Sequence, residues 1–154
     1  MSQGYVRPSV ERDAYALAPR LRQADLMEID AASGENPLQA LIRGFEQSWQ
    51  PFTMLVDDQP IGMFGAVPMD KDFLTAAIWL LSTDDLFNVR YQFLRNSRLW
   101  LDVLHKPFSI VFNYVDARNT VHVKWLKWCD FKFIAKHDQF GYRKQPFYEF
   151  VKIK

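Results

Sequence analysis

Apolar residues are spaced differently in successive parts of this chain, and the spacing predicts which elements form. The first third combines a short apolar stretch with helical repeats, where Asn36 and Pro37 have the types preferred at a helix start. Gly34 has the type preferred just past a helix end. The elements predicted here are a strand at 5–8 and helices at 11–17, 19–32 and 37–49.

Strand patterns dominate the rest of the chain. Short apolar runs are separated by polar turns such as 57–60, and Lys106 with Pro107 interrupts the longest helical pattern. The strand predicted at 108–114 is strongly apolar, which favours a central place in a sheet. The predicted elements are strands at 52–56, 61–67, 73–81, 108–114, 131–135 and 147–153, and helices at 82–105 and 119–129.

This element order predicts an α/β (α+β) fold with a mixed, mostly antiparallel central sheet flanked by helices. The chain has 154 residues, a length that suits one domain with its own core, so we expect a single domain over 1–154.

Composition and charge limit the classes of protein to which this chain can belong. The net charge of +1 gives no basic field for nucleic acid, and only the C-terminal third is enriched in basic residues. Cys129 is the single cysteine, which excludes an internal disulfide, and the three histidines lack metal-ligand spacing. No signal peptide and no apolar run of about 20 residues is present, so we expect a cytoplasmic protein that does not enter membranes.

The element order resembles the GCN5-related N-acetyltransferase (GNAT) fold along nearly the whole chain. Asn119 followed by the segment 125–131 is similar to that family's passage from an asparagine through a helix into the sixth strand. The resemblance implies that acetyl-CoA would lie in a gap between the strands at 73–81 and 108–114. Its pyrophosphate would sit at the start of the following helix, where backbone N–H groups and the helix dipole favour an anion.

A second resemblance is narrower and concentrates in the last 45 residues or so. It is similar to a small internal virion protein family of short-tailed phages, which implies a phage-encoded protein of the host cytoplasm or the virion. A phage structural protein or a host protein would then be the partner, and catalysis would be weak or lost. The residues that carry the resemblance are Phe112, Asn113, Tyr114, Val115, Asn119, Thr120, His122, Leu126 and Lys127, with Val6, Arg7 and Pro8 near the start.

The predicted cofactor loop departs from the pattern of the acetyltransferases. The stretch 81–87 has no glycine, and Asp84 with Asp85 would repel a pyrophosphate. These carboxylates also suit the start of a helix, so ordinary capping is the competing interpretation. The GNAT resemblance implies that Leu81, Ser82, Thr83, Arg90 and Asn119 are the cofactor-binding candidates, although Asn119 also suits a helix cap.

The catalytic candidates are Tyr114 and His122. The tyrosine that this family uses to protonate the leaving thiolate would align with Leu126, which has no proton to donate, so Tyr114 or His122 would have to replace it. His122 could instead hydrogen-bond at a helix end, and Cys129 among aromatic residues is expected to be a buried, inert thiol.

Two functions therefore stay open. One is a phage protein that uses this fold for virion assembly or host interaction. The other is an acetyl-CoA-dependent N-acyltransferase acting on a small amine or a protein amino group. A nucleic-acid-binding function is not favoured.

Overall fold

The computed structural model describes residues 4–72, 74–88 and 90–153, and the side chains of these except 87–95. Seven strands and five α-helices are present in this part of the chain. The strands are β1 Gly4–Pro8, β2 Phe52–Val56, β3 Gln59–Pro68, β4 Thr75–Ser82, β5 Ile110–Asp116, β6 Lys132–Phe140 and β7 Gln145–Ile153. The helices are α1 Glu11–Leu17, α2 Gln23–Ser33, α3 Pro37–Gln47, α4 Arg90–His105 and α5 Thr120–Trp128, with 3₁₀ turns at Ala18–Arg20 and Asp84–Asn88.

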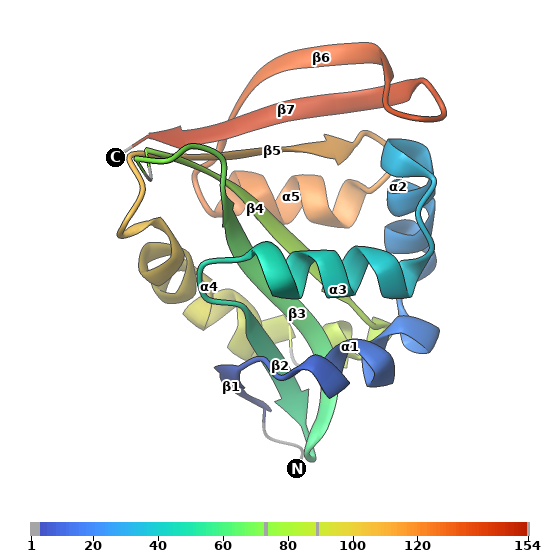
Figure 1. The fold of residues 1–154 in the computed structure, drawn as a ribbon, viewed down its shortest axis with the longest axis vertical. Helices are drawn as coiled ribbons and strands as arrows, with labels where there is room; N and C mark the ends of the chain where they lie inside the picture. Colours follow the sequence, from blue (N-terminus) through green and yellow to red (C-terminus); the bar gives the residue numbers. More distant parts are fainter. Residues whose placement is uncertain (1–3, 73, 89, 154) are drawn as a thin grey trace.

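The strands form one sheet in the order β1-β2-β3-β4-β5-β7-β6. All neighbours are antiparallel except β4 and β5, which run parallel. Helices α1 and α3 lie in front of the sheet and α4 and α5 behind it, while α2 stands at one end (Figure 1). The predicted α/β (α+β) fold with a mixed, mostly antiparallel sheet is therefore confirmed. Among the helices described, none is both long and apolar enough to span a bilayer.

Each face of the sheet has its own hydrophobic core. Phe64 and Leu80 point to the face covered by α4 and α5, where Leu101, Leu104 and Leu126 pack against them. The neighbouring residues on the same strands belong to the other core, as expected from the alternation of side chains along a strand. That second core joins the sheet to α1, α2 and α3 through Ala14, Leu17, Ile29, Ala40, Leu41, Met63 and Leu81.

Two predicted helices begin later than expected, and one contact explains both. Leu21 forms an isolated bridge with Thr83, and the Arg22 N–H donates to the Ser82 carbonyl at 2.9 Å. This contact keeps residues 21–22 extended, so α2 starts at Gln23 rather than at residue 19, where the predicted helix 19–32 begins. It also extends β4 to Ser82, so the helix predicted to open at 82 is a 3₁₀ turn followed by α4.

The turn between β6 and β7 is docked on the C-terminal end of α2. The N–H groups of Tyr142 and Arg143 donate to the carbonyls of Ala32 and Ala31, at 3.1 and 3.0 Å. These carbonyls would otherwise lack partners at the helix end. Gly141 allows the close approach, because its φ of +76° is left-handed and a Cβ there would lie 2.7 Å from the Ala31 oxygen.

Replacing Gly141 with alanine should lower the free energy of unfolding by about 1–3 kcal/mol, since the side chain meets both a backbone oxygen and an unfavourable φ. Chemical denaturation would measure this loss. The exposed Gln139 on the same hairpin provides the control, because Gln139→Ala should change stability by no more than about 0.5 kcal/mol. Equal stability of the two variants would contradict this account of the turn.

Candidate active site

Strands β4 and β5 separate soon after they meet, and this leaves a gap in the middle of the sheet. Their parallel pairing is limited to three residue pairs, from Thr75 with Ile110 to Ala77 with Phe112. Beyond that point the two strands diverge like the arms of a V (Figure 1). The gap lies between the two predicted strands where the acetyltransferase resemblance placed a groove.

The side chain of Asn113 lies at the point of the V. Its Nδ2 donates to the Ile78 carbonyl at 2.8 Å, and its Oδ1 accepts from the Tyr114 N–H, also at 2.8 Å. The amide therefore occupies backbone groups of both strands at the place where pairing ends. Because those groups are satisfied by the side chain, the strands can part without leaving buried polar groups unpaired.

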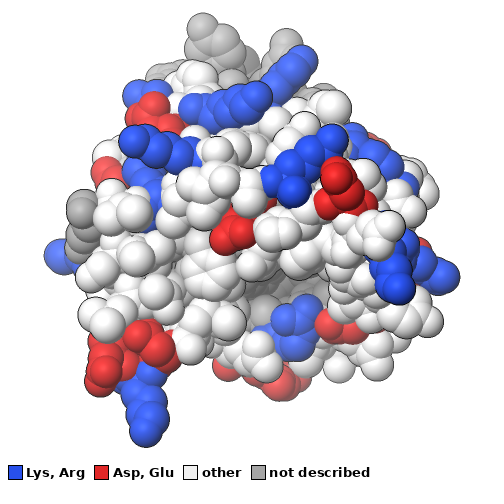
Figure 2. All heavy atoms as spheres, turned by 90° about the horizontal axis from the view of Figure 1, so that it is seen from above, with Lys and Arg blue, Asp and Glu red and all other residues white. Residues whose placement is uncertain are grey.

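A cavity of about 460 Å³ lies within the V. It reaches both faces of the sheet, since side chains of α2 and α3 border it on one face and those of α4 and α5 on the other. Figure 2, which views the molecule from the side of the β6–β7 hairpin, shows a hollow with charged side chains of both signs at its rim. The lining residues used below are Glu28, Arg43, Val67, Met69, Trp79, Leu80, Leu81, Asn113, Tyr114, His122 and Phe140.

A buried polar cluster closes the wide end of the V. We use this name for Arg22, Asp25, Glu28, Ser82 and Asn119. The Ser82 N–H donates to Asp25 Oδ2 at 3.0 Å, while Asn119 Nδ2 donates to Asp25 Oδ1 at 3.3 Å. Arg22 Nη2 donates to Asn119 Oδ1 at 3.1 Å. The start of α2 thus links the end of β4 to the start of α5.

Breaking this cluster should strongly destabilise the protein. Asp25 is fully buried, and its removal takes away the acceptor of the Ser82 N–H and the carboxylate that lies 3.8 Å from the Arg22 guanidinium. We expect Asp25→Ala to lower the free energy of unfolding by about 3–5 kcal/mol, as for other broken buried ion pairs. Denaturant titration should show almost no loss for the exposed Asp102→Ala, and a comparably mild effect of Asp25→Ala would contradict the role of the cluster.

Glu28 is the member of the cluster that lines the cavity. Its Oε1 accepts from the Asp116 N–H at 2.8 Å and from Asn119 Nδ2 at 3.4 Å. Burial, reinforced by the neighbouring Asp25 carboxylate, raises the pKa of Glu28 from 4.5 to about 8. One oxygen is thus fixed by the protein, and the carboxyl can exchange a proton near neutral pH.

The raised pKa of Glu28 should be visible in the pH dependence of stability. The folded protein keeps this proton up to about pH 8, whereas an unfolded glutamate loses it near pH 4.5. The folded state binds more protons in that interval, so the free energy of unfolding falls as the pH rises through it. Glu28→Gln should remove a decline of the order of 5 kcal/mol, since the folded pKa of about 8 lies about 3.5 above the unfolded value of 4.5 and each unit corresponds to about 1.4 kcal/mol.

Unfolding curves recorded from pH 4.5 to pH 8.5 would measure this effect. The exposed Glu46 on α3 offers a matched control, and Glu46→Gln should keep the slope of the original protein. An unchanged slope in Glu28→Gln would show that Glu28 ionises normally.

The predicted cofactor residues at the end of β4 have different surroundings. Leu81 lines the cavity, whereas Ser82 uses both backbone groups within the buried polar cluster. The Thr83 N–H donates to the Ile61 carbonyl, and its hydroxyl accepts from the Asp85 N–H at 3.1 Å. Arg90 begins α4, and its side chain lies outside the described residues.

The expected capping by the acidic pair is wrong. Thr83, not an aspartate, caps the 3₁₀ turn, because Thr83 directly precedes the turn, at the cap position, whereas Asp84 and Asp85 are its first two residues. Asp85 instead pairs with Arg20 at 3.0 Å in an exposed ion pair, and Asp84 is exposed. The negative charge of this loop is therefore partly compensated.

Asn119 stands at the N-cap position of α5, but its side chain does not cap the helix. The predicted helix cap is wrong because Arg22 and Asp25 take its oxygen and nitrogen into the buried polar cluster. Glu28 and Asn113 were missed by sequence reasoning. The available signal was that Arg22, Asp25 and Glu28 recur every three residues and so share one helix face.

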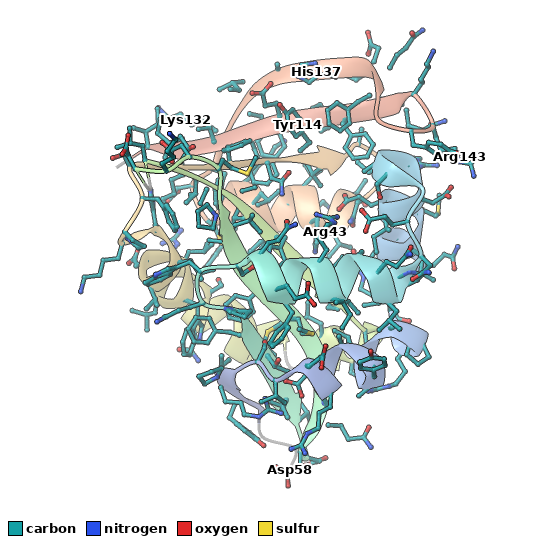
Figure 3. The ribbon with its side chains drawn as sticks, in the orientation of Figure 1. Arg43, Asp58, Tyr114, Lys132, His137 and Arg143 are labelled. Atoms are coloured by element: carbon teal, nitrogen blue, oxygen red, sulfur yellow. The ribbon has the colours of Figure 1, made fainter. Side chains whose placement is uncertain are left out.

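Tyr114 and His122 both line the cavity, but from different sides. Tyr114 points from β5 towards the β6–β7 hairpin, where its ring stacks on Phe140 at 4.4 Å between centroids (Figure 3). His122 lies on α5 beside Trp125, and its Nε2 is buried with no hydrogen-bond partner in the described part of the chain. Burial lowers the pKa of His122, so its imidazole is neutral at pH 7.

The remaining candidates are buried apolar groups. Leu126 belongs to the core beneath α5, and Cys129 is fully buried, where burial raises the pKa of its thiol. A raised thiol pKa disfavours the reactive thiolate. Within the described ranges, no group of three or more histidine, cysteine or acidic residues is placed to hold a metal ion.

The overall arrangement of the sheet and helices matches solved acetyltransferase structures. An acetyltransferase of the GNAT family from Bacillus anthracis aligns over 98% of this chain and 95% of its own, with a TM-score of 0.72 and 12% identity. Ard1 from Thermoplasma volcanium aligns over 97% of both chains, with a TM-score of 0.73 and 17% identity. The aminoglycoside acetyltransferase AAC(6')-Ib, solved with coenzyme A, covers 99% and 95% at a TM-score of 0.70 and 12% identity.

The chain therefore has the fold of the GNAT acetyltransferases. No protein-family model matches it, and no curated protein matches its sequence. Nothing in these comparisons supports the narrower resemblance to phage internal virion proteins, so a role in a phage particle stays an expectation from the sequence.

Proposed function

We propose that this protein transfers an acyl group from a coenzyme A thioester, acetyl-CoA in the simplest case, to a primary amine. The observation that carries the proposal is the cavity, which passes through the sheet at the β4–β5 gap and contains the carboxyl of Glu28. A passage through the sheet allows a donor and an acceptor to approach one point from opposite faces. The shared fold adds support, since AAC(6')-Ib has also been solved with acetyl-CoA.

The backbone of β4 offers a place for the amide-bearing arm of such a donor. The Ile78 carbonyl is taken by Asn113, and both groups of Ser82 are taken by the buried polar cluster. Leu80 lies between them, and alternate residues of a strand direct their backbone groups the same way, so its N–H and carbonyl face the gap. An extended arm with amide groups could pair with Leu80 there.

The loop that follows β4 has few N–H groups left to bind the diphosphate of the donor. The N–H groups of Thr83, Asp85 and Leu86 already donate to acceptors within the protein. We therefore assign the diphosphate to the first turn of α4 at Arg90, where a helix start favours an anion. Asn119 acts indirectly in this proposal, by holding Glu28 and closing the V.

Glu28 is the proposed proton acceptor. Coenzyme A supplies an activated acyl carbon as a thioester, and the amine must lose a proton to attack it. Only the ionised carboxyl can take up that proton; with a pKa of about 8 it is a minor form at pH 7 and the main form above pH 8, and catalytic bases work best when their pKa lies near the working pH. Tyr114 on the side of the β6–β7 hairpin and His122 on the side of α5 are proposed to contact the reactants. The neutral imidazole of His122 can donate or accept one hydrogen bond.

The test is an assay of acyl transfer from acetyl-CoA to a panel of primary amines, in which the release of the free thiol of coenzyme A is measured. The original protein should give a rate that rises with pH through an apparent pKa near 8. Glu28→Gln should lower kcat by about 100-fold or more and lose the rising limb, as expected on removal of a general base. Glu46→Gln, which alters an exposed glutamate outside the cavity, should leave both unchanged.

Calorimetry with coenzyme A separates binding from chemistry. Binding by both the original protein and Glu28→Gln, with transfer only by the original protein, supports the proposal. Absence of coenzyme A binding by the folded protein would overturn it and would favour the assembly role implied by the C-terminal resemblance.

A further inference from the structure

Arg43 is a second charged residue of the cavity, and it lies on the face opposite α4 and α5. It belongs to α3, and its guanidinium reaches into the space between α3 and β5 (Figure 3). Glu28 lines the same cavity from α2. A ligand that fills the cavity on the face of α2 and α3 would therefore have a carboxyl and a guanidinium among its surroundings.

Glu35 occupies one edge of the Arg43 guanidinium. Its Nε donates to both Glu35 oxygens, at 3.1 and 3.2 Å, and Nη2 lies 2.9 Å from Glu35 Oε1. Nη1 has no protein partner among the residues that the structure describes. Arginine carries five N–H donors in a planar fork, so one carboxylate on the Nε edge leaves the far end available for another.

The other walls of the cavity are mainly apolar. Val67, Met69, Trp79 and Phe140 line the cavity, and the Trp79 Nε1 is already used in a bond to Ser48 at 2.7 Å. Such walls favour an aliphatic or aromatic group and offer few hydrogen-bond partners to a long polar chain. A polyamine would in addition place a second cation near Arg43, where like charges repel.

We propose that the acyl acceptor is an α-amino carboxylate with an apolar side chain, either a free amino acid or a comparably small molecule. Its carboxylate binds Arg43 at the Nη1 end, its amine faces Glu28, and its side chain packs on the apolar walls. This inference rests on the proposed acyl transfer for its chemistry, but the binding of the acceptor can be measured without any donor.

The experiment compares two probes that differ only in the carboxylate, L-phenylalanine and phenethylamine, with L-leucine and 3-methylbutylamine as a second pair. Calorimetry with the protein alone should show that each amino acid binds at least 10-fold more tightly than its decarboxylated partner. Arg43→Gln should abolish this preference, because the amide keeps a hydrogen-bonding group but loses the charge.

Arg143 provides a matched control. It is also a half-exposed arginine paired with a carboxylate, that of Asp30 on α2 at 3.1 Å, but it is not among the residues that line the cavity. Arg143→Gln should therefore keep the 10-fold preference. Equal binding of both members of each pair by the original protein, or a preference that survives in Arg43→Gln, would overturn the assignment.

Transfer assays with the same four amines distinguish this failure from failure of the proposed function. Transfer to all four amines without a carboxylate preference would contradict the assignment of the acceptor and would still support the acyltransferase function. Carboxylate-dependent binding that requires Arg43, with no transfer from acetyl-CoA to any amine, would support this site and reject the acyltransferase.

Discussion

The parallel pairing of β4 and β5 ends after three residue pairs, and the rest of the site depends on that early end. Asn113 lowers the free-energy cost of separating the strands, because its amide satisfies the Ile78 carbonyl and the Tyr114 N–H at the same time. Without such a substitute, a buried gap between two strands would leave backbone donors and acceptors unpaired, and each would cost free energy. The cavity, and its access to both faces of the sheet, follow from this one side chain.

The wide end of the gap is closed by charge rather than by further strand pairing. Arg22 and Asp25 compensate one another inside the protein, and Asn119 joins them to α5. A second carboxyl placed beside Asp25 cannot ionise as easily, and this is part of the reason why the pKa of Glu28 is raised. The interactions that close the fold at this point therefore also set the protonation of the group that faces the cavity.

Local patterns in the sequence were sufficient for most of the fold. Asn36 caps α3 as predicted, with the Gln39 N–H bonded to its side chain, and Gly34 ends α2 in the left-handed conformation. These features depend on residues a few positions apart. The starts of α2 and α4 were displaced because they depend on the contact of residues 21–22 with 82–83, which no local pattern reports.

The site was much less predictable, for the same physical reason. Asn113 lies inside an apolar run and looks like part of an ordinary strand, while the charged residues of α2 look like a solvated face. Their burial depends on partners far away in the chain, since Arg22 and Asn119 are 97 residues apart. Tyr114 and His122 both line the cavity, and which side each occupies depends on the packing of β6 and α5.

The docking of the β6–β7 turn has a wider consequence for α2. This helix is fixed at its first turn by Ser82 and Asn119 and at its last turn by Tyr142 and Arg143. Glu28 sits between these two anchors, so any movement that widens the cavity on this side must release one of them. The C-terminal hairpin and the mouth of the cavity are therefore mechanically coupled. A molecule that binds the outer surface of the hairpin would also restrict which ligands can enter the cavity.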